Sequence, residues 1–231
     1  MTVKPPAYDK KEYWQERFEQ EQSFEWLVGP QKLLPILETS GVSTKTRVLQ
    51  VGCGNSELAF SLFDNGYTDI LSIDYCSNVI ERMKEETDNR YGQGSDIVKP
   101  RWKAMSALDL SNLYAPSPSS GRTPNNAAMS ANFDCVLDKG AMDAIACSDD
   151  NDNSLVNKME EQVSKLLDKD GIWIIVSYSD SRWNELNDEA KSRWSKKVIS
   201  LEVTPTNLVQ TPNGPIHQPA IYHHCYILHK L

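Results

Sequence analysis

The stretch Val48-Leu-Gln-Val-Gly-Cys-Gly-Asn-Ser56 decides the fold of this chain. Residues 47–51 form a short apolar run, which predicts a buried parallel strand. The run stops at Gly52-Cys-Gly54 and passes directly into a helix-like segment, so a ligand can lie against main chain that carries no side chain. Gly-x-Gly alone also occurs as a purely structural turn, and the rest of the chain decides between the two.

Strand-like and helix-like segments alternate outward from this turn. Expected strands are residues 47–51, 69–74, 101–105, 133–138, 172–178, 197–203 and 221–228. Expected helices are residues 56–65, a segment for which Ser77 is the candidate cap, and residues 155–168. The alternation is typical of a parallel sheet covered on both faces. We therefore expect a doubly wound α/β fold with a seven-stranded sheet and helices on both faces.

The length of 231 residues fits one large α/β domain, residues 1–231, better than two independent ones. Residues 1–40 are expected to form a helical and aromatic lid segment. Residues 114–132 are rich in Pro, Ser, Asn and Ala, which predicts a flexible surface insertion. Residues 204–219 are rich in Pro and are expected only to join the last two strands.

Composition narrows the classes of partner. The formal net charge of -8 disfavours nucleic acid and favours a basic protein partner. The five cysteines are scattered without a Cys-x-x-Cys, which argues against a disulfide framework and a zinc site. No apolar run approaches the ~20 residues of a membrane span, and the start lacks a secretory signal. We expect a cytoplasmic protein that is a monomer or a weak dimer.

An acidic residue ends the strand that follows the glycine turn. Asp74 comes about 20 residues after the turn, where a carboxylate accepts hydrogen bonds from a ribose, although a strand-end aspartate also caps the next helix. The third glycine of the dinucleotide fingerprint is missing, because position 57 is Glu57. A pyrophosphate favours that glycine and S-adenosylmethionine does not need it. The pattern therefore disfavours NAD.

Seven motifs spread over nearly the whole chain, apart from residues 114–132, occur together in a known family. They are Tyr13-Trp14-x-x-Arg17-Phe18, Phe24-Glu25-Trp26, Val51-Gly-Cys-Gly-Asn-Ser56, Ser72-Ile-Asp-Tyr75, Trp102-x-x-Met105, Val136-Leu-Asp-Lys-Gly-x-x-Asp-Ala144 and Tyr222-His-His-Cys-Tyr-Ile-Leu-His-Lys230. The set resembles the eukaryotic elongation factor 1-alpha lysine methyltransferases, a subgroup of class I methyltransferases. The resemblance implies a Rossmann-like sheet, mostly parallel with an antiparallel last strand, and S-adenosyl-L-methionine as cofactor.

The resemblance also implies roles for single residues. Asp74 is expected to hold the ribose diol and Tyr75 and Met105 to flank the adenine. Ser106 stands where the family usually has an aspartate, so its shorter, uncharged side chain predicts weaker cofactor binding. The cofactor-binding residues expected from the resemblance are Trp14, Phe18, Trp26, Gly52, Gly54, Asn55, Asp74, Tyr75, Met105, Ser106 and Lys139.

Three aromatic residues precede the sheet, namely Trp14, Phe18 and Trp26. In the family such a segment covers the cofactor, and aromatic faces stabilise a cation such as a sulfonium. The alternative is that the rings only attach the N-terminal helix to the core.

Methyl transfer to nitrogen requires a neutral amine aligned behind the methyl carbon, and a lysine with a pKa of about 10.4 must first lose a proton. Asp138 ends the fourth strand, at the edge where open α/β sheets bind ligands. We expect its carboxylate to orient the amine and help to remove the proton, which makes it the candidate catalytic residue. The alternative is an exposed Asp138–Lys139 pair of little energetic value. Asp143 and residues 148–152 add negative charge near the same edge.

Three rival functions remain open at this point. A small-molecule methyltransferase shares every cofactor residue, a non-catalytic S-adenosylmethionine-binding protein is compatible with Ser106, and an oxidoreductase is disfavoured by Glu57. The four histidines lack metal-ligand spacing, so no metal site is expected. The preferred interpretation is a methyltransferase that N-methylates a lysine of a protein such as elongation factor 1-alpha.

Overall fold

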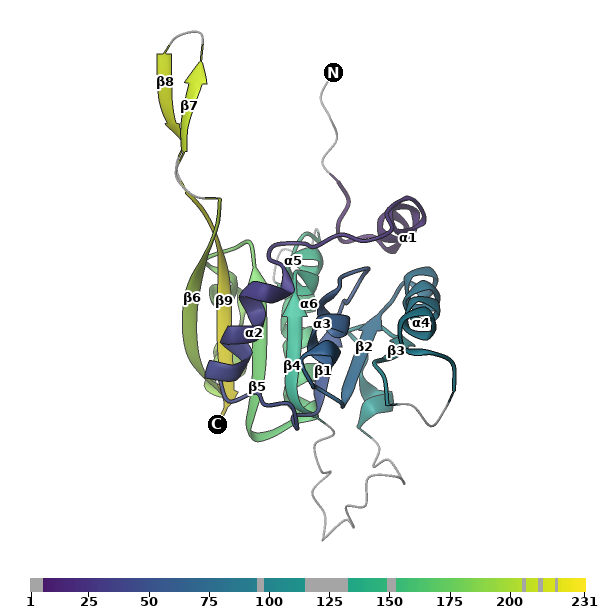
Figure 1. Cartoon of the computed structure of the whole chain (residues 1–231). Coiled ribbons are helices and arrows are strands. Elements are labelled where there is room, and N and C mark those ends of the chain that lie inside the picture. Colours follow the sequence, from purple (N-terminus) through teal and green to yellow (C-terminus); the bar gives the residue numbers. More distant parts are fainter. Residues whose placement is uncertain are drawn as a thin grey trace.

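The computed structural model describes residues 6–94, 98–114, 133–148, 153–204, 207–211, 214–218 and 220–231. Within these residues one seven-stranded sheet forms the centre of the molecule, in the order β3-β2-β1-β4-β5-β9-β6 (Figure 1). Its strands are β1 (Val48–Val51), β2 (Ile70–Asp74), β3 (Arg101–Ala104), β4 (Phe133–Lys139), β5 (Leu167–Ser177), β6 (Trp194–Thr204) and β9 (Ile221–Lys230). Neighbours from β3 to β5 are parallel, whereas β9 is antiparallel to both β5 and β6. The expected fold class is confirmed.

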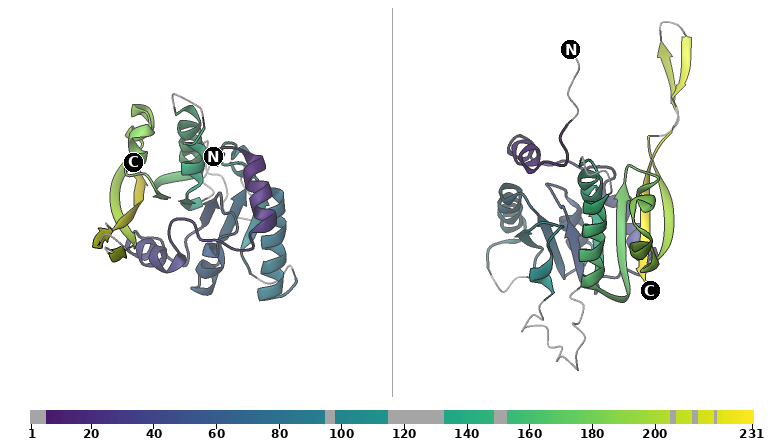
Figure 2. Two further views of the ribbon diagram at one scale, coloured as in Figure 1. Left: turned by 90° about the horizontal axis from the view of Figure 1, so that it is seen from above. Right: turned by 180° about the vertical axis from the view of Figure 1, so that it is seen from behind.

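Helices cover both faces of the sheet (Figure 2). One face carries α2 (Pro30–Thr39), α3 (Leu58–Asp64) and α4 (Ser77–Tyr91); the other carries α5 (Ala141–Ile145), α6 (Ser154–Leu166) and α7 (Asp188–Ser192). The remaining helix α1 (Lys11–Gln20) lies beside α4, and the 3-10 turns are η1 (Ser111–Leu113) and η2 (Arg182–Glu185). No helix among the described residues is long and apolar enough to span a bilayer.

Alternation of side chains along the central strands explains the two layers. In β5, Ile172, Ile174 and Val176 enter the core beneath α2 and α3, while Trp173 and Ile175 enter the core beneath α6. All five side chains are buried. Because successive residues of a strand point to opposite faces, a continuous apolar run is what a sheet covered on both sides requires.

Short elements depart from the expectation. Neither α5 nor α7 was predicted, since five residues are too few to show a helical period. The helix expected over residues 155–168 ends at Leu166, where the chain already enters β5. Ser77 is the first residue of α4, and neither it nor Cys76 before it makes a side-chain capping bond. That expected cap is wrong.

A two-stranded hairpin occupies the segment expected only to connect the last two strands. It consists of β7 (Asn207–Thr211) and β8 (Gly214–Gln218), paired antiparallel. Figure 1 shows it projecting beyond the same end of the sheet that carries α1 and α5. Residues 115–132, which make up nearly all of the expected insertion, lie outside the described residues.

Candidate active site

A cavity of about 570 Å³ opens at the carboxyl ends of β1, β2 and β4. This volume lies within the ~300–1,000 Å³ range of ligand sites. The sheet order reverses between β1 and β4, and open α/β sheets bind ligands at such a switch point. Every residue expected to bind the cofactor lines this one cavity: Trp14, Phe18, Trp26, Gly52, Gly54, Asn55, Asp74, Tyr75, Met105, Ser106 and Lys139.

The turn after β1 requires glycine at two positions. Gly52 and Gly54 have φ angles of 56° and 50°, in the left-handed region that disfavours side chains. A Cβ atom on Gly52 would lie 2.4 Å from the Cβ of Ala141, and one on Gly54 would lie 3.2 Å from Cζ of Phe18. The turn is therefore tightly packed between α5 and the N-terminal residues, and its main chain forms the cavity wall.

The Asp74 carboxylate ties the glycine turn to the next helix. One oxygen accepts the amide of Gly54 at 3.0 Å and the other accepts the amide of Cys76 at 2.9 Å. The side chain is almost fully buried, and burial raises its pKa. Each oxygen still has a lone pair for a further donor. Capping and ligand binding, given above as alternatives, are thus compatible at this residue.

The wall expected to hold an adenine is formed by the ends of β2 and β3. Tyr75 follows β2, Met105 follows β3, and the Met105 amide donates to the Asp74 carbonyl at 2.8 Å. The Ser106 hydroxyl oxygen already accepts the amide of Leu108 at 3.1 Å. That bond uses part of the accepting capacity of the Ser106 oxygen, so less remains for a hydrogen bond from an adenine amino group.

Residues 8–28, called the N-terminal cover, form one wall of the cavity. Its rings pack on one another: Trp14 lies 5.7 Å from Phe18 and 5.6 Å from Trp26 between centroids, and the Trp14 indole donates to the Tyr8 carbonyl at 2.7 Å. Phe18 is also part of the core. These rings both anchor the N-terminal cover and face the cavity.

Glu25, to which the sequence analysis gave no role, fastens the N-terminal cover. Its carboxylate accepts the Ser56 hydroxyl at 3.0 Å and the Glu57 amide at 2.6 Å, and pairs with Lys139 at 2.9 Å. Burial lowers the pKa of Lys139, and the charge of Glu25 opposes that shift. Glu25 stands inside a motif quoted above, but no spacing pattern connects it with a lysine so far along the chain.

Asp138 does not occupy the place expected of a catalytic residue. Its side chain is 1% exposed and is absent from the cavity wall. The carboxylate instead accepts the amide of Ala141 at 2.8 Å and that of Met142 at 3.2 Å, at the start of α5. The side chain therefore does not reach the cavity in this structure, and the expected contact with an incoming amine stays a prediction that the geometry does not support.

Asp138 makes stability depend on pH. Burial, and then the nearby charge of Asp143, raises its pKa to about 7. A carboxyl whose pKa rises on folding contributes stability that is complete below pH ~4 and is lost as the pH rises to about 7. We expect Asp138→Asn to gain stability relative to the wild type between pH 5 and pH 8, by a few kcal/mol at most. Urea unfolding at both pH values measures this; a pH-independent difference between the two proteins would contradict it.

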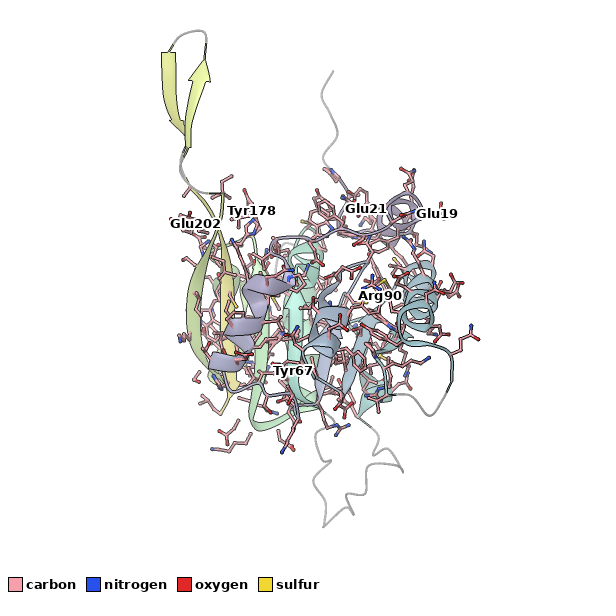
Figure 3. All side chains as sticks on the ribbon, viewed as in Figure 1. Glu19, Glu21, Tyr67, Arg90, Tyr178 and Glu202 are labelled. Atoms are coloured by element: carbon pink, nitrogen blue, oxygen red, sulfur yellow. The ribbon has the colours of Figure 1, made fainter. Side chains whose placement is uncertain are left out.

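The part of the cavity that is lined by Asp9, Asp143, Tyr178 and Arg182 is called its mouth, and it combines charged and aromatic groups. Asp143 accepts four donors: the Ser177 hydroxyl at 2.5 Å, the Tyr178 amide at 2.7 Å, and Nε and Nη2 of Arg182 at 3.0 and 2.8 Å. Tyr178 is 71% exposed, and Figure 3 shows it at the same end of the molecule as Glu21 of the N-terminal cover. Asp9 of the N-terminal cover lines the same cavity. Of these residues the sequence singled out only Asp143, together with the separate acidic run 148–152, of which residues 149–152 lie outside the described residues.

Among the described residues, no three His, Cys, Asp or Glu side chains are grouped so as to hold an ion. The bare turn and the strand-end carboxylate at a switch point define the class instead: an α/β protein that binds a nucleoside-containing ligand.

Comparison with known proteins identifies the family. A family model described as a methyltransferase domain matches residues 43–213. Solved structures show the same fold at low identity: magnesium protoporphyrin IX methyltransferase from Synechocystis, with S-adenosylmethionine bound, has a TM-score of 0.58 at 11% identity over 100% of both chains. The N-methyltransferase NodS from Bradyrhizobium japonicum, with S-adenosylhomocysteine, gives 0.56 at 12% over 98% of both chains. The chain belongs to the methyltransferase domain family, and it shares its fold with methyltransferases solved with S-adenosylmethionine or S-adenosylhomocysteine bound.

Relatives with curated names include two kinds. Methyltransferase srdJ of Neurospora crassa is 30% identical over 98% of this chain and 86% of its own length. The eEF1A lysine and N-terminal methyltransferase of Bos taurus is 31% identical over 74% of this chain but only 22% of its own length. EEF1A lysine methyltransferase 4 of Mus musculus is 26% identical over 99% of this chain and 81% of its own. The names support methyl transfer and differ in what they say of the acceptor.

Proposed function

We propose that this methyltransferase transfers its methyl group to the side-chain amine of a lysine in a protein, with elongation factor 1-alpha as the substrate to test. The observation that carries the proposal is the cavity mouth, where the carboxylates of Asp9 and Asp143 and the exposed ring of Tyr178 line the same cavity as the glycine turn. Negative and aromatic groups attract an alkylammonium. Relatives named as elongation factor lysine methyltransferases support the same acceptor.

The cavity wall fits S-adenosylmethionine. The main chain at Gly52–Gly54 leaves room for close approach, and the Asp74 oxygens retain lone pairs for ribose hydroxyls. Bound there, the cofactor supplies an electrophilic methyl carbon on a sulfonium. Trp14 and Trp26 exclude water and present ring surfaces that suit a cation.

We propose that Asp143 orients the acceptor amine. Its carboxylate accepts hydrogen bonds from four donors, two of them on the Arg182 guanidinium, so its orientation at the cavity mouth is fixed. Beside Arg182, this carboxylate would orient the arriving ammonium. The ammonium must release one proton to water, and the neutral nitrogen would then take the methyl group as the carbon–sulfur bond breaks and S-adenosylhomocysteine leaves. Tyr178, held through its amide by Asp143, forms the wall along which a long side chain approaches.

Incubation with tritiated S-adenosylmethionine and purified elongation factor 1-alpha tests the acceptor. We expect label in methyllysine after acid hydrolysis. We further expect Tyr178→Ala to raise the KM for the protein substrate about tenfold, by loss of one aromatic contact, and to leave the affinity for S-adenosylhomocysteine unchanged. Tyr222→Ala is the matched control, because Tyr222 is also an exposed tyrosine but lies away from the cavity.

A small-molecule acceptor is the second candidate. The match to methyltransferase srdJ over 98% of this chain leaves this candidate open, because that name specifies no acceptor. Arg182 in the cavity wall would also suit an anionic small molecule. Label that appears only in the low-molecular-weight fraction of a cell extract, and in no protein, would replace the lysine proposal with this one.

A further inference from the structure

A strained turn lies in the cavity wall, within the N-terminal cover. Leu27 has a φ angle of 64°, and the Val28 amide donates to the Trp26 carbonyl at 2.8 Å, which closes a three-residue turn. Turns of this kind with positive φ are rare, and the conformation is disfavoured for a residue that carries a side chain. Such a conformation persists only where its surroundings hold it in place.

Two side chains from distant parts of the sequence hold the carbonyls of this turn. Lys139 Nζ donates to the Trp26 carbonyl at 2.9 Å, and His223 Nδ1 lies 2.9 Å from the Leu27 carbonyl. A carbonyl only accepts, so Nδ1 of His223 carries the hydrogen of this bond. His223 is 8% exposed and stands on β9, near the other end of the chain.

The turn forms part of the cavity wall and is linked through His223 to the cavity mouth. Trp26 and Leu27 line the cavity, and Leu27 lies over Gly140, where an added Cβ would be 3.4 Å from its Cδ1 atom. The ring of His223 also faces the ring of Tyr178, with 5.7 Å between centroids and 53° between planes. Figure 3 shows Tyr178 at the end of the sheet where the mouth opens. One histidine thus contacts both the N-terminal cover and the mouth.

We propose that His223 is a positioning residue for methyl transfer. By donating to the Leu27 carbonyl it keeps the strained turn formed, and the turn in turn keeps Trp26 and Leu27 in the cavity wall around the cofactor. The role is independent of the acceptor, so it holds for a protein lysine and for a small molecule alike.

Two amide substitutions separate this hydrogen bond from simple packing. Asparagine places its amide near the position of Nδ1 and can still donate to Leu27, whereas glutamine places its amide near Nε2 and cannot. We expect His223→Gln and His223→Leu to weaken binding of S-adenosylhomocysteine about tenfold, as for a buried acceptor left unpaired, while His223→Asn stays near the wild type. His224→Leu is the control, because His224 is the next residue of β9 and points to the other face.

Hydrogen exchange without ligand gives a second measurement. The Val28 amide closes the turn, so peptides covering residues 24–30 should exchange faster in His223→Gln than in His223→Asn. The comparison of these two polar variants stands even if His223→Leu does not fold. Equal affinity for S-adenosylhomocysteine in all four variants, or an asparagine variant as impaired as the glutamine variant, would overturn the proposal.

Discussion

Gly52→Ala should abolish measurable binding of S-adenosylhomocysteine and lower the free energy of unfolding by about 3 kcal/mol, as overpacking at a left-handed residue does. The added Cβ would lie 2.4 Å from the Cβ of Ala141, and the backbone has a φ angle of 56°. Neither partner is the flexible end of a side chain, so β1 or α5 must move. Either movement closes the bare surface against which the ligand lies. Isothermal titration and urea unfolding measure the two effects.

Two further variants separate crowding from backbone strain. Gly41 has a φ angle of 88° but nothing within 4 Å of an added Cβ, so Gly41→Ala should cost only the ~1–2 kcal/mol of the left-handed conformation and leave ligand binding unchanged. Gly52→Ala combined with Ala141→Gly removes the clashing atom and should recover part of the binding. If Gly52→Ala behaved like Gly41→Ala, close packing of the turn would not be the reason for glycine there.

The sheet could be predicted because its strands are apolar runs that end at recognisable residues. Residues 48–51 before Gly52 and residues 172–177 after Gly171 are fully buried in the structure, as parallel strands under two helical layers must be. The ligand wall could be predicted for a related reason. Gly52, Gly54 and Asp74 stand at strand ends, and parallel strands bring those ends to one edge.

The contacts that close the site could not be predicted in this way. Glu25 meets Lys139, Asp143 meets Arg182, and the Leu27 carbonyl meets His223 across 196 positions of sequence. Each pair joins elements whose relative placement depends on the packed core, and no local period or spacing records it. These contacts decide how the N-terminal cover and the mouth are held.

Asp138, the candidate catalytic residue, shows a different limit. Its place at the end of a strand was predicted correctly, but a strand-end carboxylate can turn outward to the ligand or back onto the next helix. Here it accepts the amides of Ala141 and Met142, the first two residues of α5, although Gly140 and not Asp138 is the N-cap residue. Asp74 differs, because it accepts the amide of Cys76 just before the next helix and its side chain still lines the cavity.

Asp74→Asn should weaken S-adenosylhomocysteine binding at least ~100-fold, because hydrogen bonds to a charged group contribute about 1.5–3 kcal/mol each. An amide has one acceptor oxygen, so its NH₂ group must face the amide of either Gly54 or Cys76 and disturb the turn, and the charge that a ribose diol would find is gone. Asp69→Asn is the matched control: the same substitution just before the opposite end of β2, where Asp69 pairs with Arg47 and Arg101 at the surface. It should leave binding unchanged.

A thermodynamic cycle that combines Asp74→Asn with a modified ligand distinguishes a direct contact of Asp74 with the ribose from its effect on the glycine turn. If Asp74 holds the sugar, removal of the ribose 2′-hydroxyl from S-adenosylhomocysteine should weaken binding to the wild type and have little further effect on Asp74→Asn. Equal losses in the two proteins would mean that Asp74 acts only by holding the Gly54 amide. Because the carboxylate is buried and accepts one main-chain amide on each oxygen, we expect the first result: buried lone pairs are costly to leave unpaired, and ligand hydroxyls are donors that can reach them from the cavity.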